Sequence, residues 1–121
     1  MMDLTHRIEN GICLINLAEN LISSNVSEVQ NYLKPLIQDE STTGIVLNLE
    51  NVLYIDSSGF GLLISVYQSL RKREIKFALC DVDEKIIEYF ARMKIDRFLD
   101  VYPNEKSALT GLDSPGNSVQ S

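Results

Sequence analysis

Cysteine, histidine and long apolar runs are scarce in this sequence, and each scarcity excludes a class of protein. The two cysteines, Cys13 and Cys80, each lie in an apolar, strand-like run, so we expect two buried thiols and neither a disulfide nor a Cys-x-x-Cys redox pair. One histidine, His6, leaves little from which to build a histidine-rich metal site, so no metal is expected. No apolar run approaches the ~20 residues that span a bilayer, which argues against direct membrane insertion.

Basic residues are in the minority as well. The net charge of -6 argues against a nucleic-acid partner, because a surface that tracks phosphates needs clustered Lys and Arg. The longest basic cluster, Arg71–Arg73, lies where a helix is expected to end, and cations at that position favour the helix dipole. The first ten residues are too polar for a signal peptide, so the predicted location is the cytoplasm.

What is present is a regular alternation of strand-like and helix-like segments. Asn10-Gly11 is typical of a tight turn between two strands, and short apolar runs later in the chain indicate strands buried on both faces. The predicted elements are a hairpin over 5–17, a helix after Ser23, Ser24 and Asn25, a strand over 44–49, a helix after Asp56, a strand over 75–80, a helix with Ile86, Tyr89, Phe90 and Met93 facing the core, a strand within 97–102, and a short helix from Pro103-Asn104 to Gly111.

This order predicts one α/β domain over residues 1–112, followed by a flexible tail over 113–121. The domain would hold a mixed, mostly parallel β-sheet with an N-terminal antiparallel hairpin and about four helices.

The stretch YIDSSGFG, Tyr54 to Gly61, lies at a predicted strand-to-helix turn, where open α/β sheets place their functional loops. A purely structural interpretation is available, with Asp56 or Ser57 as an N-cap and the glycines allowing close packing. Three catalytic interpretations fail. The sequence lacks the Gly-x-Ser-x-Gly motif and the nearby base of a serine hydrolase. It also lacks the spacing and the lysine of a phosphate loop, and the acidic pair that holds Mg²⁺ in a phosphate-accepting receiver.

A serine that receives a phosphate fits the stretch better. Hydroxyls at an exposed helix start are accessible to a kinase, and a phosphate adds about -1.5 to -2 charges at pH 7. The free N–H groups and the dipole of the helix start tolerate that charge. A partner that packs against a neutral hydroxyl would reject the dianion.

The segment from Ile45 to Leu109 resembles the anti-sigma factor antagonists of the STAS domain family, above all in LNLENVLYIDSSGFGLL and LDVYPNEKSAL. The resemblance implies a bacterial partner-switching protein that is not an enzyme and carries no cofactor. An anti-sigma factor, itself a GHKL-type serine kinase with bound ATP, would phosphorylate Ser57, with Ser58 as the second candidate. A PP2C-type phosphatase would reverse the modification. The unphosphorylated form would bind the anti-sigma factor and release a sigma factor for transcription.

The predicted partner-binding residues surround this turn. They are Asn20, Ser23, Ser24, Asp56, Ser57, Ser58, Gly59, Phe60 and Gly61. For Phe60 a core position is the alternative, and residues 81–84 either border the same surface or form an ordinary helix start.

The chain departs from the family pattern in the segment after the second strand, where the family usually shows Gly-x-x-Asp and this chain has Glu19 at the Gly and Ile22 at the Asp. Ile22 stands where the family usually carries an Asp near the phosphorylated serine, and an apolar side chain cannot replace a carboxylate toward a basic partner. An alternative function therefore stays open, in which the chain is a STAS scaffold or a transporter-associated module without a phosphorylation switch.

Overall fold

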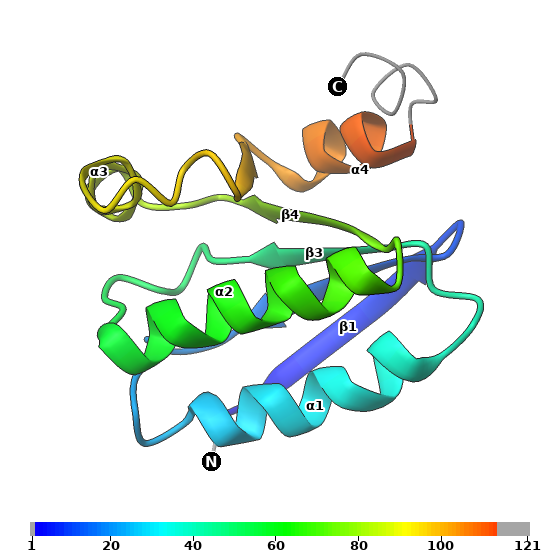
Figure 1. Cartoon of the computed structure of the whole chain (residues 1–121), viewed down its shortest axis with the longest axis horizontal. Helices are drawn as coiled ribbons and strands as arrows, with labels where there is room; N and C mark the ends of the chain where they lie inside the picture. The colour runs from blue at the N-terminus through cyan, green and yellow to red at the C-terminus, as the bar shows by residue number, and fades with distance from the viewer. Residues whose placement is uncertain (1, 114–121) are drawn as a thin grey trace.

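The computed structural model describes residues 2–113, in which five strands and four helices alternate as the sequence predicts (Figure 1). In chain order they are β1 (Leu4–Glu9), β2 (Ile12–Leu17), α1 (Val26–Gln38), β3 (Gly44–Asn48), α2 (Ser57–Lys72), β4 (Lys76–Cys80), α3 (Glu84–Arg92), β5 (Asp100–Tyr102) and α4 (Glu105–Asp113). Of the tail predicted over 113–121, only Asp113 is described, as the last residue of α4, and the rest lies outside the described residues.

The strands form one mixed sheet in the order β1-β2-β3-β4-β5. β1 runs antiparallel to β2, and the other neighbouring pairs are parallel, which confirms the predicted fold class. Asn10 and Gly11 make the hairpin turn with φ angles of 51° and 82°, the left-handed conformation that this kind of turn requires. Because β2, β3 and β4 are parallel, their carboxyl ends and the loops that follow them lie at one edge of the sheet.

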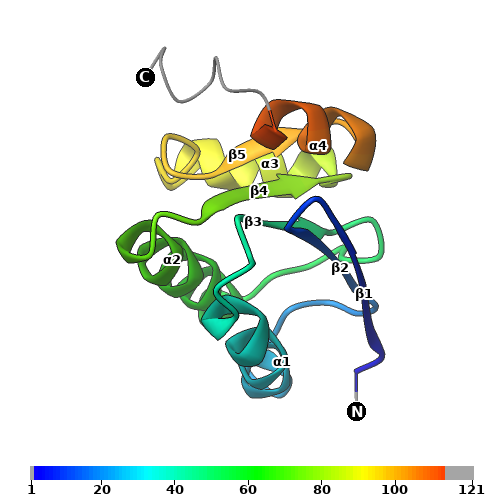
Figure 2. The same cartoon turned by 90° about the vertical axis from the view of Figure 1, so that its right-hand side faces the viewer.

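Two layers of helices cover the two faces of this sheet (Figure 2). α1 and α2 pack on the face that carries the larger core, which includes Ile15, Leu47 and Leu79. α4 packs on the opposite face against a smaller core that includes Leu14 and Val46. Strand residues therefore alternate between two apolar cores, which explains why β3 is buried along its whole length.

α3 departs from its predicted packing. Ile86 and Phe90 are buried as expected, but Tyr89 and Met93 are 48% and 45% exposed. α3 lies beside the start of α2, where the ring of Phe90 meets that of Phe60 at 5.8 Å between centroids. The helix thus contacts its neighbours along a narrow stripe, and the prediction that Tyr89 and Met93 belong to the core is wrong.

Gly111 does not end the last helix, because α4 continues to Asp113. A Cβ atom at Gly111 would collide with the ring of Tyr102 on β5. This glycine is therefore explained by the close approach of α4 to the sheet and not by helix termination. Within residues 2–113, no helix is both long enough and apolar enough to cross a membrane.

Candidate functional site

Asp56 organises the turn between the loop after β3 and α2. It is the N-cap of α2, and its Oδ1 accepts a hydrogen bond from the backbone N–H of Gly59 at 2.9 Å. Its Oδ2 accepts a second bond, also 2.9 Å long, from the backbone N–H of Ser23 in the loop after β2. One carboxylate therefore caps the helix and fixes a second loop beside it.

These hydrogen bonds also set the charge of the site. The N–H of Gly59, and after it those of Ser23 and Ser58, lower the pKa of the Asp56 carboxyl below its usual value. A carboxylate that accepts backbone N–H bonds is stabilised in its ionised form. Asp56 is consequently an anion at neutral pH, directly next to Ser57 in the chain.

The two loops beside Asp56 are joined by their backbones. Leu21 and Ile55 form an isolated parallel bridge, in which Leu21 N–H donates to the Tyr54 carbonyl at 3.1 Å and Asp56 N–H donates to the Leu21 carbonyl at 3.2 Å. The Oδ1 atom of Asn20 accepts from Leu53 N–H at 2.7 Å and from Tyr54 N–H at 3.0 Å. The loop 18–25 is thus held against the loop 49–56, next to the start of α2.

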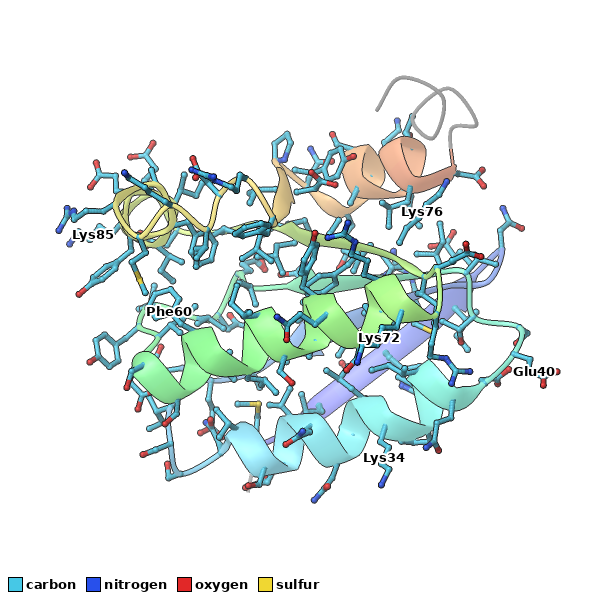
Figure 3. All side chains as sticks on the ribbon, viewed as in Figure 1. Lys34, Glu40, Phe60, Lys72, Lys76 and Lys85 are labelled. Carbon is cyan, nitrogen blue, oxygen red and sulfur yellow. The ribbon has the colours of Figure 1, made fainter. Side chains whose placement is uncertain are left out.

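The structure brings all nine predicted contact residues to this turn. Ser23, Ser24, Ser57, Ser58 and Gly61 are exposed, Asn20 and Asp56 are half-buried, and Gly59 and Phe60 are buried. The two candidate phosphate acceptors are therefore open to solvent in the first turn of α2. Phe60, at 7% exposure, points toward α3, where its ring lies 5.5 Å from that of Tyr89, as the core alternative describes (Figure 3).

The two glycines of the motif have different surroundings. A Cβ atom at Gly59 would collide with the carbonyl oxygen of Leu21 and lie 2.6 Å from Cγ2 of Ile55. A Cβ atom at Gly61 would meet nothing within 4 Å. Only Gly59 is required for α2 to approach the joined loops, so the structure gives no packing reason for glycine at position 61.

Two shallow grooves flank the exposed serines. One, with a volume of about 380 Å³, is lined by Ser57, Phe60, Gly61, Ile64, Ser65, Gln68, Met93 and Ile95. The other includes Asn20, Ile22 and Ser24 on the loop after β2, together with Leu53. Ile22 is half-buried here, so an apolar side chain occupies the place where a carboxylate was expected from the family pattern.

Sequence reasoning missed the most exposed apolar residues of the site. Leu53 and Tyr54 are 69% and 57% exposed, and neither is among the predicted partner-binding residues. Their position directly before the DSSG turn was the available signal, because large apolar side chains on an exposed loop often mark an interaction surface.

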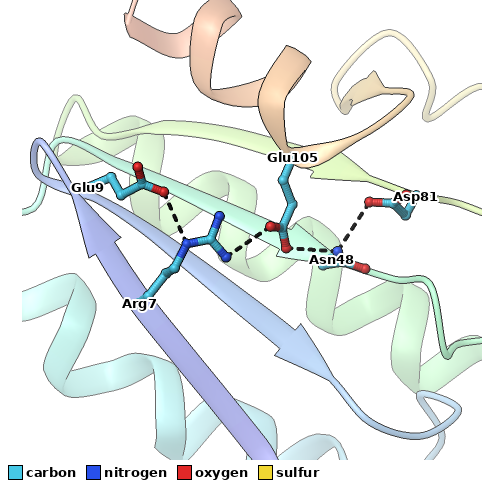
Figure 4. A network of polar contacts seen from close by, with 5 residues as sticks. All are labelled: Arg7, Glu9, Asn48, Asp81 and Glu105. Carbon is cyan, nitrogen blue, oxygen red and sulfur yellow. Dashed lines mark hydrogen bonds and ion pairs between the residues drawn. The ribbon is translucent and has the colours of Figure 1, made fainter.

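The segment 81–84 forms a helix start, as its structural interpretation describes. Oδ1 of Asp83 accepts from Lys85 N–H at 2.8 Å and caps α3. Asp81 points instead toward β3, where its Oδ2 accepts from Nδ2 of Asn48 at 3.1 Å (Figure 4). The same Asn48 nitrogen donates to Glu105 on α4 at 2.9 Å, so Asp81 belongs to a polar network on the α4 face of the sheet.

The site lacks the parts of a hydrolytic centre. Nδ1 of His6 makes a hydrogen bond with the Tyr32 hydroxyl, so the imidazole is engaged between β1 and α1 and not at the serines. Among residues 2–113 there is no group of three or more His, Cys, Asp or Glu side chains placed to hold a metal ion. What the turn offers is two exposed hydroxyls, a fixed anion and an apolar surround.

Known proteins resemble this chain in sequence. The model of the STAS domain family matches residues 3–108. An anti-sigma F factor antagonist of Paenibacillus polymyxa is 27% identical over 103 residues, which cover 85% of this chain and 88% of the relative.

Solved structures show the same fold. An anti-sigma factor antagonist from Mycobacterium paratuberculosis superimposes with a TM-score of 0.83 at 17% identity, over 94% of this chain and 96% of its own. The Bacillus cell fate determinant SpoIIAA, in its phosphorylated form, superimposes with a TM-score of 0.69 at 19% identity, over 90% and 96% of the two chains.

Proposed function

This chain belongs to the STAS domain family, and from that premise we propose that it is an anti-sigma factor antagonist whose binding is switched by phosphorylation of Ser57. It acts as a binding protein and not as an enzyme. The partner is an anti-sigma factor that is also a GHKL-type serine kinase, and a PP2C-type phosphatase restores the binding form. The naming of the Paenibacillus relative as an anti-sigma F factor antagonist supports this assignment.

The observation that carries the proposal is the state of Ser57 in the first turn of α2. Its side chain is exposed, and it follows a carboxylate that is fixed by N–H groups from two segments of the chain. The turn therefore fixes the backbone around Ser57 and leaves its hydroxyl exposed. A kinase can reach it without unfolding of the helix.

A phosphate on Ser57 would change the surface more than the fold. The helix start tolerates an anion because its N–H groups and dipole favour negative charge. Asp56 opposes that gain through repulsion, since it is already ionised. The net internal effect is small, while the charge of the exposed surface changes by about -1.5 to -2.

The surroundings of Ser57 make that change effective against a partner. Ser57 lines a groove together with the apolar side chains of Ile64, Met93 and Ile95, and the second groove holds Leu53. A partner that packs on these side chains removes water from the serine between them. A dianion at the centre of such an interface would lose its hydration without gaining a cation, so binding would weaken.

Ile22 gives the proposed interface its own character. A partner that is met by Ile22 and Leu53 on this side of the serine gains apolar contact in place of an ion pair. We therefore expect the kinase of this chain to present an apolar side chain, and not a basic one, toward the loop after β2.

The test is binding of purified variants to the cognate anti-sigma factor by calorimetry. Ser57→Asp should weaken binding by at least about tenfold, which is about 1.4 kcal/mol, while Ser57→Ala retains it. Ser69→Asp is the matched control and should bind like the wild type, because it places the same charge on the exposed surface of α2 outside the predicted contact residues. Equal binding by wild type and Ser57→Asp would favour the alternative of a constitutive STAS scaffold or transporter-associated module.

Phosphorylation itself is tested by intact-mass spectrometry of the protein from its own cells. A species about 80 Da heavier that maps to Ser57 and is absent from Ser57→Ala is the expected result. Absence of that species under several growth conditions would contradict the switch.

A further inference from the structure

The first strand leaves one edge of the sheet open. β1 is the outermost strand in Figure 2, no described strand pairs with its outer side, and five of its six residues are exposed. The opposite edge strand, β5, has three residues, and a short edge is one of the protections against pairing with another chain. β1 is twice as long, carries no proline and pairs continuously with β2, so it lacks that protection.

Alternate residues of β1 turn their backbone groups toward the open side. The carbonyl of Gly11 accepts from Thr43 N–H at 2.8 Å and therefore points toward β3. Because these directions alternate along a strand, Ile12 points back toward Glu9, its opposite residue on β1. By the same alternation, three residues of β1 direct N–H and C=O outward, where they have no hydrogen-bond partner among residues 2–113. They are Leu4, His6 and Ile8.

The side chains of β1 divide between the two faces of the sheet. His6 makes its hydrogen bond with Tyr32 on α1, and Nη1 of Arg7 pairs with Glu105 on α4 at 2.9 Å. Ile8 lies on the same face as His6 but is 56% exposed. A large apolar side chain therefore lies uncovered beside the open backbone groups.

A second copy of β1 can pair with this edge in few registers. A two-fold axis perpendicular to the sheet makes the two strands antiparallel and keeps each side chain on its own face. Outward-pointing residues must lie opposite outward-pointing residues, because these exchange the hydrogen bonds. If most of the strand is used, the axis passes through Thr5, His6 or Arg7.

Charge complementarity selects one of these three registers. With the axis through Thr5, Asp3 lies opposite Arg7 of the second copy, and the same pair forms twice. With the axis through His6, Asp3 lies opposite Glu9, and with the axis through Arg7 two guanidinium groups face each other. Like charges directly opposite destabilise a sheet, whereas opposite charges stabilise it. Asp3 is exposed and makes no ion pair within residues 2–113, so it is available for this contact.

We propose that the chain forms a homodimer through the outer edge of β1, with Thr5 on the two-fold axis. The two sheets then join into one, because Leu4 of each copy exchanges backbone hydrogen bonds with His6 of the other. The exposed side chain of Ile8 is covered by the second copy. The proposal goes beyond the proposed function and does not depend on Ser57 or on an anti-sigma factor, since neither contributes to this edge.

The first test is sedimentation velocity of the full-length chain from micromolar to near-millimolar concentration. The average mass should rise toward that of two chains, and association should weaken as salt rises, because the two ion pairs lie at the surface. A monomer at every concentration would overturn the proposal and leave the edge to a strand from a different protein.

Cysteine substitutions test the register. Opposite residues that do not exchange hydrogen bonds have Cα atoms about 4.5 Å apart, within the range that a disulfide spans. Oxidation with copper phenanthroline should therefore link Thr5→Cys into a covalent dimer, whereas His6→Cys and Arg7→Cys are the controls for the other two registers and should stay unlinked. The native Cys13 and Cys80 are buried and do not interfere. Preferential linkage through position 6 or 7 would overturn the proposed pairing.

A charge reversal tests the ion pair across the axis. Asp3→Lys places a cation opposite Arg7 and should weaken association at least about tenfold. Glu88→Lys makes the same change of charge on the exposed surface of α3 and should leave association within about twofold. Equal weakening by both would show that net charge alone governs association and would overturn the proposal. Ser57→Ala should dimerise like the wild type, so this outcome is independent of the outcome for the switch.

Discussion

At the scale of single residues, the carboxylate of Asp56 both fixes the backbone of the turn and gives the turn its negative charge. Its carboxylate caps α2 through Gly59 N–H and fixes the loop after β2 through Ser23 N–H, each at 2.9 Å. The residue types of this turn could be predicted from the motif, because Asp is a favoured N-cap. The bond to Ser23 could not, since it joins segments 33 residues apart and depends on how the two loops lie side by side.

The lowered pKa of Asp56 predicts how stability changes with pH. The folded pKa lies below the unfolded value of about 3.9, so the carboxylate stabilises the fold above that pH and ceases to do so as pH falls through the folded pKa. Wild type should therefore melt above Asp56→Asn at pH 7, and the difference should shrink below about pH 4. Melting curves by circular dichroism from pH 7 to pH 3 provide the measurement. A difference that stays constant over this range would show that ionisation of Asp56 does not matter.

The role of glycine in the turn can be tested by comparing alanine substitutions at Gly59 and Gly61. Gly59→Ala places a methyl group against Leu21 and Ile55, and we expect it to destabilise the protein by about 1–3 kcal/mol. Gly61→Ala enters open space on an exposed helix turn and should stabilise it by about 0.5–1 kcal/mol. Urea denaturation of the two variants gives both values. If Gly59→Ala were as stable as wild type, α2 would not need its close approach to the joined loops.

At the scale of elements, the sequence patterns predicted most of the order of strands and helices. Alternation of apolar and turn residues was sufficient for β1 and β2, and a continuous apolar run for β3. The incorrect predictions concern which side chains of a helix are covered by its neighbours. Tyr89 and Met93 follow helical spacing with Ile86 and Phe90, but spacing cannot reveal that α3 is short and contacts its neighbours along one narrow stripe.

One polar network connects three elements and the loop after β4, and it has no counterpart in the sequence patterns (Figure 4). Nδ2 of Asn48 on β3 donates to Asp81 after β4 and to Glu105 on α4, and Oε1 of Glu105 pairs with Arg7 on β1 at 2.9 Å. Asn48 is 7% exposed, so its amide is the buried centre of the network. Asn48 thereby holds two carboxylates that would otherwise repel each other.

Replacement of Asn48 by Asp tests this role. The change removes both donated hydrogen bonds and adds a third carboxylate, so we expect a loss of stability on the order of 3 kcal/mol at pH 7. The new carboxyl should have a raised folded pKa, and the loss should therefore lessen as pH falls through that value. Asn48→Ala is the control: it adds no carboxyl group, so its cost of about 1–3 kcal/mol should change less between pH 7 and pH 5 than the cost of Asn48→Asp. Urea denaturation at pH 7 and pH 5 distinguishes the two, and an equal cost for both at each pH would contradict the argument.

At the scale of the whole molecule, parallel strands determine where the turn at Asp56 lies. The carboxyl ends of β2 and β3 meet at one edge of the sheet, so segments that are far apart in the sequence, including Asn20 and Asp56, lie together. This convergence could be predicted from the order of elements. The position of Leu53 and Tyr54 before the DSSG turn indicated apolar residues near the site, but their exposure could not be predicted, because it depends on the path of a loop that has no periodic pattern.

The two free thiols report whether the molecule unfolds as one unit. Cys13 lies in the core beneath α1 and α2, and Cys80 lies in the smaller core beneath α4, both at 0% exposure. Burial raises the pKa of both thiols, so neither is reactive while the fold is closed. If the two cores unfold together, both cysteines should react with iodoacetamide at the same rate. The dependence of that rate on urea should then equal the dependence of global unfolding.

Peptide mapping by mass spectrometry measures the two rates in the same sample, so each cysteine is the control for the other. Faster labelling of Cys80, with weak urea dependence, would contradict cooperativity and show that α4 opens alone. Separate opening of α4 would expose only the smaller core, because α4 is a helix of nine residues that is held on the sheet partly through Glu105. Asn48→Ala should then increase the rate at Cys80 more than at Cys13, whereas in a cooperative molecule it increases both equally.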